Sequence, residues 1–129
     1  MTDKPAIGAI EWRDLTIEHA EAVSEFYAAV VGWTRDPVSM DDYSDYSMVT
    51  PAGETVAGVC HARGPNADMP PQWLMYVRVA NVEDSAASCE RLGGKVLVAP
   101  KDMGGSRFCV IEDPAGAVLG LIADIEADA

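Results

Sequence analysis

The chain has 129 residues, 49% of them apolar, and a formal net charge of −12 at pH 7. This length suits one domain with one core, and the negative charge argues against nucleic acids and anionic membrane surfaces, because both would repel it. No apolar run reaches the roughly 18–20 residues of a membrane span, and the N-terminus lacks the apolar core of a signal peptide. We therefore expect a soluble, cytoplasmic protein whose ligands are neutral or cationic.

The first half of the chain predicts one strand, one helix and three more strands. An apolar run predicts the first strand over 7–16, and an amphipathic pattern predicts a helix that begins at Thr16 or Glu18 and closes at Gly32. The apolar residues expected on one side of this helix are Ala22, Val23, Phe26, Tyr27, Val30 and Val31. The next strands are expected from Trp33 to a stop at Asp36-Pro37, over 46–49 and over 55–61, with a polar loop at 37–44.

The second half of the chain repeats this order. A cluster of prolines, glycines and polar residues over 63–71 predicts a linker between the halves. Gly104-Gly105-Ser106 lacks the strand-to-helix setting of a phosphate-binding loop and predicts a hairpin turn or a flap. The remaining elements are a strand over 73–79, a helix over 82–92, and strands over 95–99, 107–112 and 117–123.

The two halves also share glycine and proline positions at a nearly constant offset. Gly32 and Gly94 lie 62 positions apart, and Pro51-Ala52-Gly53 returns 63 positions later as Pro114-Ala115-Gly116. This internal repeat predicts two βαβββ modules, at about 7–62 and 72–124, within a single domain over 1–129. The expected fold class is α+β, with curved mixed β-sheet around a cleft and the helices on the outside.

Three motifs in this order and spacing resemble the vicinal oxygen chelate superfamily, which includes glyoxalases, extradiol dioxygenases and bleomycin-resistance proteins. The motifs are Phe26-Tyr27 with Val31-Gly32-Trp33, Leu92-Gly93-Gly94-Lys95-Val96, and Asp113-Pro114-Ala115-Gly116-Ala117. The resemblance covers residues 10–122 and is nearest to proteins described as related to lactoylglutathione lyase. It implies the paired-module fold and, for the bleomycin-type members, metal-independent binding by a dimer.

The resemblance also implies four metal-ligand positions, one on the first and one on the last strand of each module. In this sequence those positions carry Trp12, Gly58, Leu74 and Gly120. None of these side chains binds a divalent metal ion. A shift of one residue would bring in Glu11, but one carboxylate does not make a metal site. We therefore expect no metal and no other cofactor.

Strand alternation selects the side chains that would line the cleft, because residues two apart on a strand share a face. Trp12 supplies an apolar wall, Tyr76 supplies a hydroxyl, and the glycines are expected to widen the cavity. The residues predicted to contact a ligand are Trp12, Asp14, Gly58, Cys60, Leu74, Tyr76, Arg78, Val118 and Gly120. The residues expected to pack beneath the helices are Leu15, Ile17, Val77 and Val79. Alternatively, the aromatic side chains only fill the core of the sheet.

No nucleophile–base motif identifies a catalytic centre, so Asp14, Tyr76 and His61 are the only candidates for acid–base chemistry. Because a lone buried charge is costly, Arg78 is expected to pair with Asp14. A displaced metal site could be built from His61, Asp14 and water, but one histidine and one carboxylate rarely suffice for a transition metal. The cysteines have no metal-ligand spacing and are expected to pack as small apolar residues without a disulfide; they are Cys60, Cys89 and Cys109.

Two functions remain open. The first is a metal-independent protein, expected to be a homodimer, that binds a neutral or cationic small organic molecule. The second is a glyoxalase-like lyase or isomerase that uses a displaced metal site, or Asp14 and Tyr76 as acid and base. Fold alone does not choose between them. A structural dimer without a ligand is a third reading, which requires a cleft filled by its own side chains.

Overall fold

The computed structural model describes residues 5–125 and contains two βαβββ modules, as the repeat predicts. The first module consists of β1 (Ile10–Ile17), α1 (Ala20–Val31), β2 (Thr34–Ser39), β3 (Ser44–Val49) and β4 (Thr55–His61). The second consists of β5 (Trp73–Arg78), α2 (Val82–Arg91), β6 (Lys95–Met103), β7 (Ser106–Glu112) and β8 (Val118–Asp124). A short 3-10 helix, η1 (Gly64–Asn66), lies in the predicted linker. The α+β class is confirmed.

The contacts divide the chain into two compact units. The N-terminal unit comprises residues 12–73, and the C-terminal unit comprises residues 74–125 together with 5–11. The backbone of Arg78 holds the early residues in the C-terminal unit: Gly8 N donates to Arg78 O at 2.8 Å, and Arg78 N donates to Ala9 O at 2.9 Å. None of the helices among the described residues is long and apolar enough to cross a membrane.

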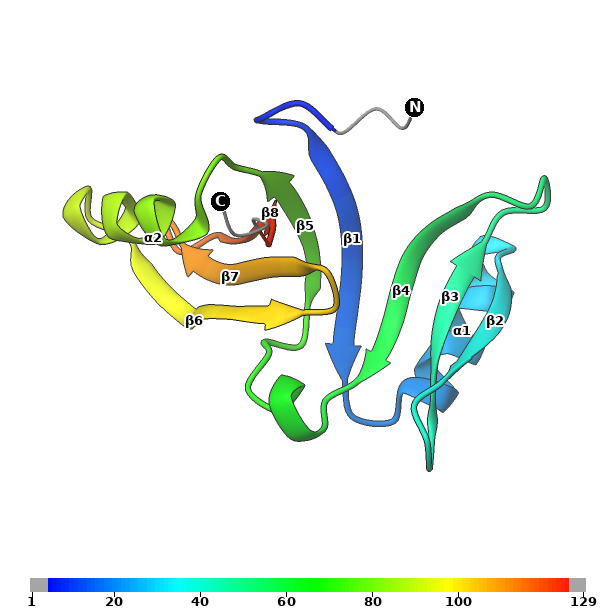
Figure 1. Ribbon diagram of the computed structural model, residues 1–129. Helices are drawn as coiled ribbons and strands as arrows, with labels where there is room; N and C mark the ends of the chain where they lie inside the picture. Colours follow the sequence, from blue (N-terminus) through cyan, green and yellow to red (C-terminus); the bar gives the residue numbers. More distant parts are fainter. Residues whose placement is uncertain (1–4, 126–129) are drawn as a thin grey trace. The chain divides into compact units, whose positions relative to one another are not determined.

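In the N-terminal unit the strands pair in the order β2-β3-β4-β1. β1 and β4 are parallel, with Asp14 opposite Gly58, whereas β3 is antiparallel to both of its neighbours. α1 packs on one face of these strands (Figure 1). The sheet of this unit is therefore mixed, as expected, and its helix covers one of the two faces.

The buried side of α1 differs from the prediction. Ala20 and Ser24 are fully buried, while Phe26 and Val30 are 57% and 64% exposed. Small side chains one helical turn apart let α1 approach the sheet closely and are its most deeply buried residues. Of the predicted apolar residues, Tyr27 does pack against the core cluster. The helix also begins later than expected, at Ala20, because β1 continues to Ile17.

β2 is longer than predicted and passes through Pro37, which was expected to end it. Pro37 lies opposite Tyr46 of β3. Proline removes a backbone donor, but in the sheet of this unit β2 pairs only with β3, so the missing donor interrupts no second ladder. The predicted loop over 37–44 is thus confined to the residues between Ser39 and Ser44.

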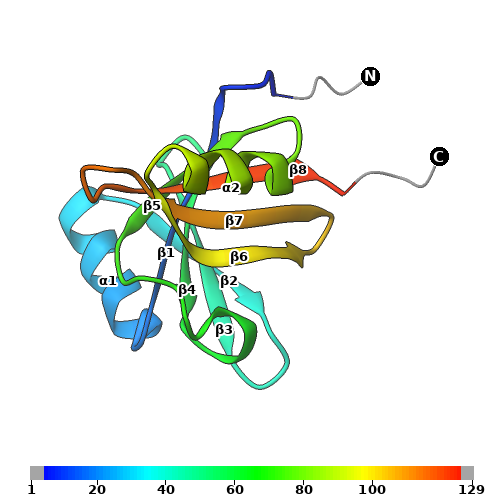
Figure 2. The same cartoon turned by 90° about the vertical axis from the view of Figure 1, so that its left-hand side faces the viewer.

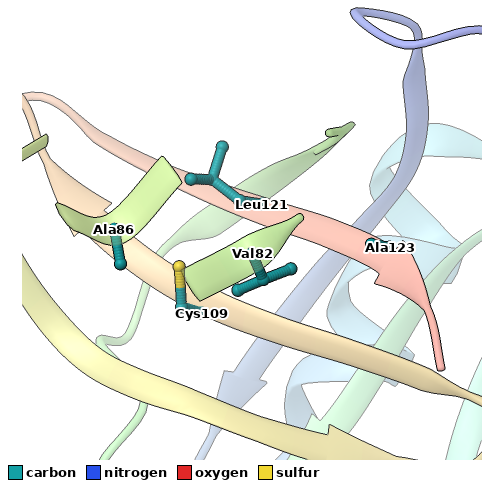
Figure 3. Close-up of a cluster of buried hydrophobic side chains, with 5 residues drawn as sticks. All are labelled: Val82, Ala86, Cys109, Leu121 and Ala123. Carbon is teal, nitrogen blue, oxygen red and sulfur yellow. The ribbon is translucent and has the colours of Figure 1, made fainter. Parts of the chain in front are cut away.

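In the C-terminal unit the strands pair in the order β5-β8-β7-β6, and only the β5–β8 pair is parallel. α2 lies over one face of this sheet (Figure 2). Beneath it, Val77 and Val79 pack against a buried cluster as alternation predicts. The cluster consists of Val82, Ala86, Cys109, Leu121 and Ala123 (Figure 3).

β6 extends to Met103, beyond the predicted end at residue 99, with register shifts around Val98. The glycine pair that follows it forms the turn to β7, which confirms the predicted hairpin. The three cysteines are free, as predicted, and Cys109 is completely buried.

Candidate functional site

Asp14 is the centre of a polar cluster inside the N-terminal unit. Alternation along β1 places Trp12, Asp14 and Thr16 on the face opposite Leu15, and Leu15 is 5% exposed. Asp14 pairs in register with Gly58 of β4, and Thr16 pairs with Cys60. Ala57 and Val59, which point the other way from β4, belong to the core cluster that includes Ala20 of α1. The expected packing of Ile17 beneath the helix is confirmed here, whereas contact of the opposite face with a ligand stays a prediction.

Gly58 has no room for a side chain. A Cβ atom at this position would collide with Oδ1 of Asp14 and would lie 3.7 Å from Cζ2 of Trp12. The sequence led us to expect that glycine would widen a cavity at this point. That expectation is wrong, because the Asp14 carboxylate fills the space.

The Asp14 carboxyl holds its proton more tightly than an ordinary aspartic acid. Asp14 is 9% exposed, and burial raises its pKa from the ordinary 3.8 to about 6. Hydrogen bonds from the side chains of Cys60 and Trp12 oppose this rise, while the nearby charge of Asp45 adds to it. Near neutral pH, Asp14 is therefore a buried carboxylate that readily takes up a proton.

Cys60 lies between two carboxylates. Its Sγ donates to Oδ1 of Asp14 at 3.7 Å. Burial, followed by the charges of Asp14 and Asp45, raises the pKa of the Cys60 thiol. Cys60 therefore remains a neutral thiol, which can donate a hydrogen bond but cannot act as a thiolate nucleophile.

Asp45 belongs to this cluster, and sequence reasoning missed it. Asp45 is 8% exposed, and its Oδ1 accepts a hydrogen bond from the backbone N of His61 at 2.8 Å. The Nδ1 of His61 is 3.2 Å from the same oxygen. His61 thus pairs with Asp45 and not with Asp14, the residue that was considered beside it for a displaced metal site. The alternation of Asp45 and Ser47 with Tyr46 and Met48 along β3 was the signal that could have found it.

In the C-terminal unit, Tyr76 occupies the space beside Gly120. The two residues pair in register across β5 and β8, and a Cβ at position 120 would lie only 2.5 Å from Cδ2 of Tyr76. Tyr76 is 2% exposed, and its ring makes an edge contact with Phe108 at 6.2 Å between centroids. Here too the expected widening by glycine is wrong. Leu74 is buried and Val118 is half-buried, and contact of these residues with a ligand stays a prediction.

Arg78 pairs with acidic residues of its own unit. Its Nε and Nη2 donate to the two carboxylate oxygens of Glu11 at 2.8 Å and 2.9 Å, and Nη2 also reaches Asp124 at 3.2 Å. These hydrogen bonds, chiefly the one to Glu11, raise the pKa of Arg78. Glu11 and Asp124 thus satisfy the guanidinium within its own unit. The expected pair of Arg78 with Asp14, which belongs to the other unit, stays a prediction.

Comparison with known proteins decides the family. Residues 14–122 match the model of the glyoxalase-like domain. The chain belongs to the glyoxalase-like domain family. It is thereby a member of the vicinal oxygen chelate superfamily, and the resemblance seen in its sequence is confirmed.

Two relatives illustrate how this glyoxalase-like chain compares with full-length proteins. It is 31% identical to the anthracycline biosynthesis protein DnrV of Streptomyces peucetius, over 90% of this chain and 47% of that protein. It is 33% identical to the Mycobacterium bovis protein CFP32, which is named as a glyoxylase, over 88% of this chain and 45% of that protein. The chain thus spans about half the length of these relatives.

Solved structures share the fold of this glyoxalase-like chain. Methylmalonyl-CoA epimerase from Mycobacterium tuberculosis superposes with a TM-score of 0.56 at 13% identity, covering 98% of this chain and 94% of that one. A variant of the Streptomyces coelicolor epimerase, bound to 2-nitronate-propionyl-CoA, gives a TM-score of 0.52 at 17% identity, covering 94% and 100%. At such identities the likeness concerns the fold alone.

The side chains at the four family metal positions do not fit a metal ion in this chain. Glycine at positions 58 and 120 offers no ligand atom, and the Cβ space at each is taken by Asp14 or Tyr76. Trp12 and Leu74 offer no metal-binding atom either. Within residues 5–125, no group of three or more His, Cys, Asp or Glu side chains is arranged to hold a metal ion.

Proposed function

We propose that this glyoxalase-like chain binds a small organic molecule, neutral or cationic, on the face of the N-terminal unit around Trp12 and Asp14, without using a metal. The observation that carries this proposal is the buried Asp14 carboxylate, which is held by neutral donors and lies beside an indole ring. An apolar wall with a few convergent polar groups is the usual composition of a small-molecule site.

The two side chains would contribute different parts of the binding energy. The half-buried Trp12 offers a flat apolar surface that an aromatic or alicyclic body can cover. Asp14 can accept a hydrogen bond when ionised and can donate one when protonated, and a pKa of about 6 makes both states accessible near neutral pH. The net charge of −12 disfavours anionic ligands throughout.

The relatives suggest a first probe. Two of them, DnrV and the Streptomyces protein DauV, are named for anthracycline biosynthesis, and this chain is 31% and 30% identical to them. An anthracycline that carries an aminosugar combines a planar aromatic body with a cationic nitrogen. Such a compound has the two features that Trp12 and Asp14 would recognise.

Binding of the anthracycline can be tested by thermal shift and by calorimetry in the presence of EDTA. We expect stabilisation that grows with ligand concentration, about 2.7 kcal/mol at a hundredfold excess over Kd. Trp12→Ala should weaken binding about tenfold or more. Arg13→Ala is the matched control, since the Arg13 side chain donates to Val56 O at 3.3 Å and is exposed. Unchanged binding by Trp12→Ala would contradict this location for the site.

A second candidate function is a glyoxalase-like lyase or isomerase in which Asp14 transfers the proton. The observation in its favour is the raised pKa of about 6, which is suited to general acid–base work near neutral pH. Turnover of a thiol adduct of a dicarbonyl compound, persisting in EDTA and lost in Asp14→Asn, would support the enzyme. Binding of the anthracycline without any such turnover would support the binding protein.

A further inference from the structure

The charges around Asp14 are unbalanced within its unit. The neighbours on its own face are Trp12 and Thr16 on β1, Gly58 and Cys60 on β4, and Asp45 on β3. None of them carries a positive charge, and Asp45 is itself acidic. Among the described residues of the N-terminal unit, no ion pair reaches Asp14.

The cations of the unit are occupied elsewhere. Residues 12–73 contain three arginines and no lysine. Arg13 donates to Val56 O at 3.3 Å. Arg35 donates to Ser24 Oγ at 3.0 Å and forms an ion pair with Glu25. Arg63 lies over the Tyr43 ring and forms an ion pair with Asp42. His61 is held by Asp45, and His19 is exposed at the start of α1. The unit therefore retains no arginine or lysine for Asp14.

Cys60 fixes Asp14 without neutralising it. The thiol donates to Oδ1 of Asp14, and its other acidic neighbour is Asp45. Because a thiol is neutral, it holds the carboxylate in place while leaving its negative charge uncompensated. A carboxylate that is 9% exposed and has no counter-ion among the described residues of its own unit is costly to maintain, and a bound cation would remove that cost.

We propose that the ligand of this site is an organic ammonium compound, whose positive nitrogen pairs with the Asp14 carboxylate while its apolar body packs on the Trp12 indole. The indole adds a second attraction, because tryptophan is the best aromatic partner for a cation. This inference rests on the proposed small-molecule function and narrows its ligand class from neutral or cationic to cationic.

Three probes with one aromatic body and three charges test the inference: 2-naphthylmethylamine, 2-naphthylmethanol and 2-naphthoate. Calorimetry at pH 7.5 should show the amine binding at least tenfold more tightly than the alcohol, with the naphthoate weakest. In Asp14→Asn the amine should lose about tenfold in affinity while the alcohol changes less than twofold. Asp36→Asn removes one exposed acidic group from β2 and is the matched control for net charge. This variant should still bind the amine at least tenfold more tightly than the alcohol.

A measurement on the unchanged chain keeps the inference testable if Asp14→Asn does not fold. At pH 5 Asp14 is mostly protonated, so the amine should bind about tenfold more weakly than at pH 7.5, whereas the alcohol should not. Equal affinities for amine and alcohol would overturn the ammonium assignment and leave the proposed function standing. An equal loss of affinity for the amine and the alcohol in a folded Asp14→Asn variant would also overturn the ammonium assignment. Failure of all three probes and of the anthracycline would instead contradict the proposed function itself.

Discussion

The Asp14 carboxylate occupies the space that a side chain at position 58 would need. The second module repeats this relationship with different side chains. Tyr76 lies 62 positions after Asp14, and Gly120 lies 62 positions after Gly58. In both modules the glycine on the last strand accepts a side chain from the parallel first strand. Two of the positions at which the family resemblance implies metal ligands therefore carry glycines that follow one packing rule. The space beside the glycine is filled by a carboxylate in one module and by a phenol ring in the other.

Gly120→Ala should destabilise the chain because its Cβ would overlap the Tyr76 ring, with Cδ2 at 2.5 Å and Cε2 at 2.6 Å. The ring is buried against Phe108 and has little room to move. We expect a loss of about 1–3 kcal/mol in the free energy of unfolding, measured by urea denaturation. Gly105→Ala is the matched control, because nothing lies within 4 Å of its Cβ position. Equal effects of the two substitutions would contradict the packing rule.

Gly58→Ala should act through Asp14, and a double-mutant cycle can show this. The new methyl group would push the carboxylate away from Cys60, so we expect a loss of about 1–2 kcal/mol. In an Asp14→Ala background the new methyl group meets only the Trp12 ring at an ordinary contact distance of 3.7 Å, so the same substitution should cost about 1 kcal/mol less. Additive effects in denaturant titrations would show that the two residues do not compete for the same space.

The sequence predicted the order of elements well because its signals are local. Glycines and prolines at the offset of 62 to 63 positions mark turns and helix ends, and alternation correctly placed Ile17 and Val77 against the clusters beneath the helices. The buried side of α1 was predicted only in part: Tyr27 packs against the core cluster, but Phe26 and Val30 satisfy helical periodicity equally well on an exposed side. Which side packs depends on how closely Ala20 and Ser24 allow the sheet to approach, and that is a tertiary property.

The candidate site was predictable in its members but not in its pairings. Trp12, Asp14, Gly58 and Cys60 share a face because residues two apart on a strand do so. The partners of Arg78 and His61 depend on which strands lie next to each other, and neither Glu11 nor Asp45 was selected as a partner in advance. The collision at position 58 depends on the register of β1 against β4, which a single sequence does not state.

The Arg78–Glu11 pair should contribute more to stability than an exposed ion pair of similar geometry. The Arg78 side chain is 10% exposed and Glu11 is 19% exposed, so Arg78→Met would leave a largely buried carboxylate without a partner. We expect a loss of about 3 kcal/mol in the free energy of unfolding, partly recovered in Arg78→Met with Glu11→Gln. Arg107→Gln is the control, because the ion pairs of Arg107 with Glu83 and Asp102 are exposed and its removal should have little effect. No recovery in the double variant would show that Arg78 acts through another contact.

Asp14 should make the stability of the chain fall as pH rises from about 4 to 6. Its pKa is raised from 3.8 to about 6 in the folded state, so the folded chain binds the proton more tightly than the unfolded chain. Below pH 4 the carboxyl is protonated in both states and does not change the free energy of unfolding. Above pH 6 it is ionised in both states, and the burial of its charge lowers the free energy of unfolding by about 3 kcal/mol, as expected from a pKa shift of roughly two units. Asp14→Asn is uncharged at every pH and removes this dependence.

The variant should therefore match the unchanged chain at pH 4 and exceed its unfolding free energy by up to about 3 kcal/mol at pH 7.5. Because other carboxylates titrate over the same range, the informative quantity is the difference between the two proteins in denaturant titrations at pH 4, 5, 6 and 7.5. A difference that stays constant over this range would mean that Asp14 titrates like an exposed aspartate. The same difference should shrink when the amine probe is present, since a bound ammonium group removes the cost of ionising Asp14 and stabilises only the chain that keeps the carboxylate.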